Sequence, residues 1–156
     1  MRFPAECVAS QLVLTLGPRV DERTMQDTVD LVLTNDSGVG CHLDGYPGVS
    51  FVDSQSDQLP FEDVWGGDQM VTSATPSLVE LAPNQAAYIR VNTIPCSESP
   101  GAPASDVRVI PPNDDDWLQV SLAGAPEITA CGADDPGRTE HVSPVEASIQ
   151  ATAASR

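Results

Sequence analysis

Residues 28–34 read TVDLVLT, and this stretch decides the fold class. Val29, Leu31 and Leu33 recur at every second position, which is the period of a strand that buries one face in a hydrophobic core. Asp30 falls on the opposite face, so we expect its side chain to face water. The segment is the clearest strand in the chain.

Similar short segments, separated by Gly, Pro, Asn and Asp, follow along the rest of the sequence. No window of twelve residues shows a convincing helical period, and prolines are scattered throughout. Short alternating strands between regular turn signals predict an all-β protein, an antiparallel sandwich. The expected strands cover residues 11–16, 28–34, 41–43, 49–52, 86–93, 106–110, 117–122 and 138–145.

Two other segments lack this alternation. Residues 53–77 are rich in Asp, Gln, Gly and Ser, and we expect a long, mobile loop with at most one irregular strand. Residues 148–156 are small and polar, which predicts a flexible tail. With 156 residues the chain suits one domain, which we place at residues 1–147.

The charge of the chain excludes several partners. There are 23 Asp and Glu against seven basic residues, all of them Arg, for a formal net charge of -16. Nucleic-acid binding needs clustered Lys and Arg, so we expect no nucleic-acid partner. The longest apolar run is far too short for a membrane span, so we expect no membrane insertion. A halophilic cytosolic protein is an alternative explanation of this composition.

The four cysteines, Cys7, Cys41, Cys96 and Cys131, are far apart and form no C-x-x-C pair. Three disulfide pairings exist. We favour Cys7 with Cys41 and Cys96 with Cys131, because these pairs close two loops of similar size. Disulfides imply an oxidising compartment; four free thiols in a cytosolic protein are the alternative. No signal peptide is visible after Met1, so an exported protein would have a targeting segment outside this sequence.

Several motifs together resemble a known family. The most specific of them is CHLDGYPGV at residues 41–49, which begins with Cys41; others are LVLTN at 31–35, LAPNQ at 81–85 and VRVIPP at 107–112. Cys7 precedes these motifs, Cys96 lies between the last two, and Cys131 follows them. From about residue 7 to residue 145 the chain resembles the actinobacterial domain of unknown function DUF4232. Asn84 stands where that family usually has Gly, and Asn still permits the turn.

The resemblance implies a secreted or lipoprotein-anchored domain of the actinobacterial cell envelope with an immunoglobulin-like fold. It carries over no catalytic residue, because none is established for the family. The lipobox that would show anchoring is not present in this sequence.

Catalytic and metal chemistry find little support in the residues themselves. Only His42 and His141 are available as bases, and no G-x-S-x-G motif is present, so we expect no enzyme. We expect no cofactor and no metal centre. The densest acidic clusters are residues 113–116 and residues 134–135, and neither has the alternating spacing of an EF-hand loop. A cation- or small-ligand-binding sensor domain that uses these acidic loops is the alternative function.

Aromatic residues in loops are the better binding candidates, because aromatics make up only 4% of the chain. Tyr46 precedes Pro47 between two glycines, and Trp65 lies in the long acidic loop. Exposed aromatics on loops often anchor partners, although packing on the protein's own surface is the simpler interpretation. We also expect a cis bond before Pro47, and a position in the core or at its edge for Trp117.

The sequence thus predicts a monomeric immunoglobulin-like β-sandwich with two disulfides, located in the cell envelope or outside the cell. Its expected role is non-catalytic: it binds a protein or another envelope component, or serves a structural purpose. The loops rather than the sheets would carry that function.

Overall fold

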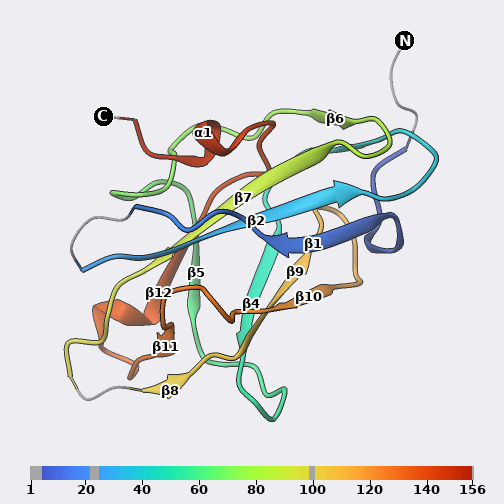
Figure 1. Ribbon diagram of the computed structural model, residues 1–156. Helices are drawn as coiled ribbons and strands as arrows, with labels where there is room; N and C mark the ends of the chain where they lie inside the picture. Colours follow the sequence, from blue (N-terminus) through green and yellow to red (C-terminus); the bar gives the residue numbers. More distant parts are fainter. Residues whose placement is uncertain (1–4, 22–24, 99–100, 156) are drawn as a thin grey trace.

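The computed structural model describes residues 5–21, 25–98 and 101–155. Its largest element is a five-stranded sheet in the order β1-β2-β7-β12-β5 (Figure 1). Strands β2 and β7 pair along eight residues, with Leu31 opposite Ile89. The strands are β1 (Leu12–Leu16), β2 (Asp27–Asn35), β5 (Glu62–Trp65), β7 (Ala86–Thr93) and β12 (Thr139–Val142).

A three-stranded antiparallel sheet, in the order β10-β9-β4, and two short strand pairs complete the β structure. The three strands are β4 (Gly48–Val52), β9 (Asp106–Ile110) and β10 (Leu118–Ser121); the short pairs are β3 (Cys41–Leu43) with β6 (Val79–Leu81) and β8 (Ala102–Pro103) with β11 (Thr129–Ala130). Helical structure in the described part of the chain consists of η1 (Ala9–Gln11), η2 (Pro136–Arg138) and α1 (Ile149–Thr152). No helix among the described residues has the length and apolarity needed to cross a bilayer.

The hydrophobic core contains side chains of both larger sheets. Leu31 and Ile89 from the five-stranded sheet and Phe51 and Val107 from the three-stranded sheet are fully buried in one cluster. Burial of each such side chain contributes roughly 1.5–3 kcal/mol. The alternation that begins at Val29 therefore does place one face of β2 in the core.

Both disulfides form with the pairing that the loop sizes favour. Cys7 bonds to Cys41 at the start of β3, and Cys96, which follows β7, bonds to Cys131 beside β11. The described residues contain no free cysteine. Each bridge thus connects parts of the chain that are 34 or 35 residues apart.

The opposite face of the five-stranded sheet is covered by two segments of chain. Thr72 donates a backbone hydrogen bond to Thr152 of α1 (2.9 Å), and Ala154 donates one to Met70 (3.0 Å). Helix α1 packs beside β7, and Thr152 is fully buried (Figure 1). A flexible tail is the expectation from the sequence, whereas the structure holds residues 152–154 against residues 70–72 by these hydrogen bonds. The boundary between domain and tail at residue 147 stays a prediction.

Two further differences from the sequence-based prediction concern β5 and Asp30. Strand β5 lies inside the expected long loop and pairs with β12 in parallel, so the sheet is not wholly antiparallel. Asp30 does lie on the face away from the core, but its exposure is only 4%, because the covering segments and Arg90 shield it from water. The expectation that Asp30 faces water is wrong.

Candidate functional site

The two aromatic residues singled out in the sequence lie together at the edge of the five-stranded sheet. Trp65 ends β5, and its ring stacks on that of Tyr46 with centroids 4.9 Å apart and planes 3° from parallel. Trp65 remains 60% exposed. The pair therefore presents an open aromatic face beside the last strand of the sheet, where a partner can reach it.

The turn that carries Tyr46 is fixed by its neighbours. Gly45 has a φ of +124°, which residues with a Cβ rarely adopt, and its carbonyl accepts a hydrogen bond from the backbone of Val145 (3.0 Å). The described residues contain no cis peptide bond, so the predicted cis bond before Pro47 is wrong. Gly45 supplies the reversal of the chain that a cis bond would otherwise provide.

A pair of carboxyl groups lies on β5 and β12, two residues before Trp65 and Val142. Asp63 of β5 is opposite Glu140 of β12 in the parallel register, as Trp65 is opposite Val142. Val142 belongs to the core, so Glu140, two residues before it, points to the same side, and its exposure is 1%. Asp63 is exposed. The sheet edge thus joins a buried carboxyl group to an exposed one.

Glu140 has no partner that stabilises its charge. Neither of its carboxyl oxygens receives a hydrogen bond from the described residues. Burial, and then the proximity of Asp63, raise the pKa of Glu140 well above its usual value. Two carboxylates cannot donate to each other, so a hydrogen bond between Glu140 and Asp63 forms only when one of them is protonated.

We expect Glu140→Gln to stabilise the protein at alkaline pH. Above pH 4.5 the unfolded chain loses the Glu140 proton that the folded chain retains, so the free energy of unfolding falls as pH rises toward the folded-state pKa. The neutral amide removes this loss, and at pH 8 the gain should be about 1–3 kcal/mol. Urea unfolding at pH 4 and pH 8 measures it.

Glu80→Gln, at an exposed position in β6, is the control for removal of one negative charge. In this variant the free energy of unfolding should change between pH 4 and pH 8 by the same amount as in the wild type. An E140Q protein that is less stable than the wild type at pH 8 would contradict the prediction.

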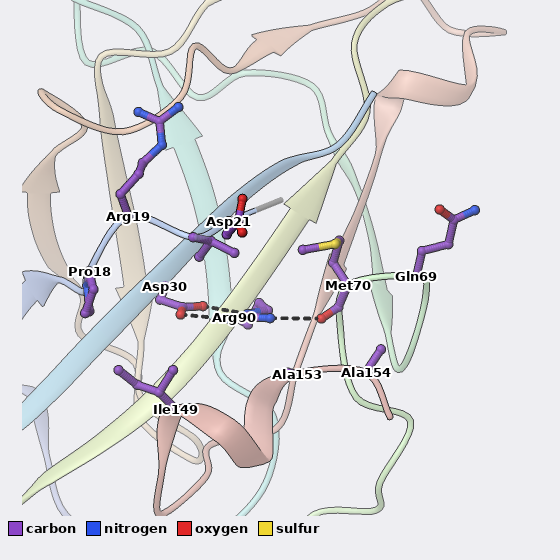
Figure 2. A pocket seen from close by; sticks show the side chains of 11 residues that line it. Pro18, Arg19, Asp21, Asp30, Gln69, Met70, Arg90, Ile149, Ala153 and Ala154 are labelled. Carbon is purple, nitrogen blue, oxygen red and sulfur yellow. Dashed lines mark hydrogen bonds and ion pairs between the residues drawn. The ribbon is translucent and has the colours of Figure 1, made fainter. Parts of the chain in front are cut away.

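A cavity of about 310 Å³ lies on the other face of the sheet (Figure 2). At its floor, Arg90 donates through Nε and Nη2 to both carboxylate oxygens of Asp30 (2.7 and 3.0 Å) and through Nη1 to the Met70 carbonyl (3.3 Å). Arg19 at the rim instead donates to the Gly124 carbonyl (3.2 Å). The charges at the floor are therefore already paired within the protein.

A smaller cavity of about 160 Å³ adjoins it near the end of β7. The buried amide of Asn92 donates to Gln26 (2.6 Å) and Asp68 (2.8 Å) and accepts from the Thr28 hydroxyl (2.7 Å). His141 also lines this cavity, and its Nδ1 is buried without a hydrogen bond from the described residues. Most of the polar groups here thus satisfy one another and connect β2, β7 and the segment after β5.

In each of the two acidic clusters, one aspartate accepts hydrogen bonds from the backbone. Asp114 accepts hydrogen bonds from the backbone of Ala9 (2.8 Å), Asp115 and Asp116, and the bond from Ala9 is the main reason that the pKa of Asp114 is lowered. Asp135 accepts from the backbone of Gly137 (2.9 Å), which likewise lowers its pKa.

One group of potential metal-binding side chains occurs in the described residues: Cys96, Cys131 and Asp135. The two sulfur atoms are bonded to each other, so they do not offer the thiolates that a metal needs. Asp135 also accepts bonds from the backbone of Ser97 and Glu98. The geometry of this group is that of a capped turn beside a disulfide.

The remaining sequence candidates lie apart from the β5 edge. Trp117 is 54% exposed and carries the Arg108 guanidinium over its ring at 4.8 Å, so its predicted core position is wrong. His42 is half-buried in β3, and His141 is in β12. Sequence reasoning missed Asp63 and Glu140, because their meeting depends on a parallel pairing between distant segments.

Comparison with known proteins adds the family. No curated protein and no solved structure matches the sequence significantly. The model of a domain of unknown function, DUF4232, matches residues 7–146, a range that includes both strands of the edge just described. The resemblance noted in the sequence is confirmed, and the chain belongs to the DUF4232 family.

Proposed function

We propose that the protein is a non-catalytic, immunoglobulin-like binding module of the actinobacterial cell envelope, and that it contacts its partner through the β5 edge. The observation that carries the proposal is the stacked pair of Tyr46 and Trp65, with Trp65 60% exposed at the last strand of a sheet. Folded proteins seldom leave large aromatic rings exposed on an edge strand, because such edges promote aggregation.

The choice of this edge over the cavities follows from the state of their polar groups. The ion pair of Asp30 and Arg90 and the network around Asn92 are hydrogen-bonded within the protein. A ligand entering either cavity would compete with bonds that already exist. The aromatic face needs no such exchange, and aromatic anchors dominate the energy of many interfaces.

The extracytoplasmic location is supported by the two disulfides, since disulfides persist in oxidising compartments. A catalytic role lacks the usual constellation, in which a nucleophile contacts a base that a third group orients. Within the described residues, the side chains of His42 and His141 form no hydrogen bond with a serine, a cysteine or a carboxylate.

Photo-crosslinking in intact host cells tests the proposed contact. A benzophenone amino acid at position 65 should give a discrete adduct in the envelope fraction, because this residue faces the partner. The same amino acid at position 117 is the matched control, since Trp117 is similarly exposed and lies elsewhere, immediately before β10. Absence of an adduct at position 65, or an identical adduct at position 117, would contradict the proposed function.

A further inference from the structure

The β5 edge contains a buried carboxyl group that no group in the described structure would neutralise once it ionises. Glu140 is buried with both carboxyl oxygens unpartnered, and Asp63 beside it is exposed. A buried carboxylate is stable only with a counterion or enough hydrogen-bond donors. Asp63 and Glu140 therefore lack a positively charged partner. Such a group could approach from the solvent, on the side where Asp63 lies.

An aromatic surface lies next to these carboxyl groups on the same face. Asp63 and Trp65 are two residues apart on β5, which separates them by roughly 7 Å along the strand. A cation over the face of a Trp ring is held by the ring's quadrupole. The chain contains one such contact already, Arg108 over Trp117 at 4.8 Å. Carboxylate and ring together suit a long side chain with an apolar stem and a cationic end.

The backbone of β5 can also pair with a further strand. The backbone N–H of Gly66 donates to Val142 of β12 (3.2 Å). Since N–H and C=O groups alternate in direction along a strand, Val64 also faces β12, while Asp63 and Trp65 direct theirs away from it. Strand β5 is the last strand of its sheet. Two N–H and two C=O groups are thus available at this edge.

We propose that the β5 edge binds an extended, basic segment of another protein, which pairs with β5 and places an Arg or Lys side chain against Asp63, Glu140 and the ring of Trp65. This partner class rests on the function proposed above. A second copy of the chain fits poorly, because two surfaces with a net charge of -16 repel each other. Addition of a strand supplies affinity, and the side-chain contacts supply selectivity.

Fluorescence titration with synthetic peptides tests the partner class. The probes are acetylated and amidated pentapeptides of Thr and Val with one arginine at the second, third or fourth position, each matched by a citrulline peptide of the same shape without charge. The protein carries Trp117→Phe, which leaves Trp65 as the only tryptophan. We expect saturable binding of an arginine peptide at millimolar concentration or below, and about tenfold weaker binding of its citrulline match.

Variants identify the groups responsible. Asp63→Asn should weaken binding of the arginine peptide about tenfold. Glu140→Gln should weaken it to a similar degree, because a bound arginine displaces the Glu140 proton and pairs with the carboxylate, whereas glutamine cannot ionise. Glu62→Gln is the matched control. This substitution also removes one negative charge from β5, but on the opposite face of the strand, so it should leave the affinity for the arginine peptide unchanged. N-methylation of the peptide backbone at the residues facing β5 should abolish binding.

Four results would overturn the proposal: no binding of any arginine peptide, equal binding of arginine and citrulline peptides, equal losses with Glu62→Gln and Asp63→Asn, or the same fluorescence change with calcium chloride alone. If position 65 crosslinks a partner in cells while arginine and citrulline peptides bind equally, the cationic partner is wrong and the binding function stands. If arginine peptides bind but position 65 gives no crosslink, the proposed function fails although the edge recognises cations.

Discussion

Replacing Cys96 and Cys131 together with alanine should lower the free energy of unfolding by about 4 kcal/mol. The bridge closes a loop with a sequence separation of 35, and its loss returns the entropy of that loop to the unfolded chain. The bridge also connects the segment after β7 to that after β11, where Asp135 caps the adjoining turn. Urea unfolding of the oxidised wild type and the variant at neutral pH measures the loss.

The other disulfide is a matched control. Cys7 and Cys41 are 34 residues apart, so loop entropy alone predicts an equal loss for the corresponding double alanine variant. Cys7 and Cys41 are both almost fully buried, and a larger loss there would measure packing in addition to entropy. A loss below about 1 kcal/mol for either variant would contradict the expected role of the bridges.

The size of this effect bears on the compartment. Domains of this size have a total stability of about 5–15 kcal/mol, so loss of both bridges would remove much of it. A chain that depends on two disulfides to this degree would be marginal where thiols are kept reduced. Stability measured with and without a reductant therefore also tests the proposed extracytoplasmic location.

The sequence predicts β2 and β7 well, because both have residues that alternate between the core and the other face. Strand β5 has no such signal: all four of its residues are exposed, so no periodicity marks it. Its partner β12 is 77 residues away in register, since Glu62 pairs with Thr139. Local patterns do not contain information on a pairing of this kind, and β5 is therefore only a weak expectation within a predicted loop.

The same reason explains what could be predicted of the candidate site. Tyr46 and Trp65 are recognisable singly as aromatics among turn residues, but their stacking depends on where β5 lies. Glu140 occurs in the sequence as one acidic residue among 23. Only the parallel register brings it beside Asp63 and makes its burial unusual. Composition identifies the candidates, and tertiary pairing decides which of them meet.

The two faces of the five-stranded sheet contain different kinds of buried carboxyl group. On the core side, Glu140 is buried without a partner. On the other side, Asp30 is buried with two charge-assisted hydrogen bonds from Arg90. The first arrangement leaves a carboxyl group that a ligand can satisfy, whereas the second is complete in itself. This difference is the reason that binding is assigned to the β5 edge and stability to the cavity floor.

Arg90→Met should therefore destabilise the protein by about 3–5 kcal/mol, because it leaves the Asp30 carboxylate buried without its counterion. The Met70 carbonyl also loses one of its two donors and keeps only the bond from Ala154, so amide hydrogen exchange at residues 70–72 should increase. The double variant Asp30→Val with Arg90→Met should recover most of the lost stability, since an apolar pair has no charge to desolvate. Arg108→Met is the matched control and should cost no more than about 1 kcal/mol, because that arginine lies at the surface over Trp117. Urea unfolding of all four proteins gives the comparison; a double variant as unstable as Arg90→Met alone would show that the packing of the arginine, rather than its charge, holds the covering segment on the sheet.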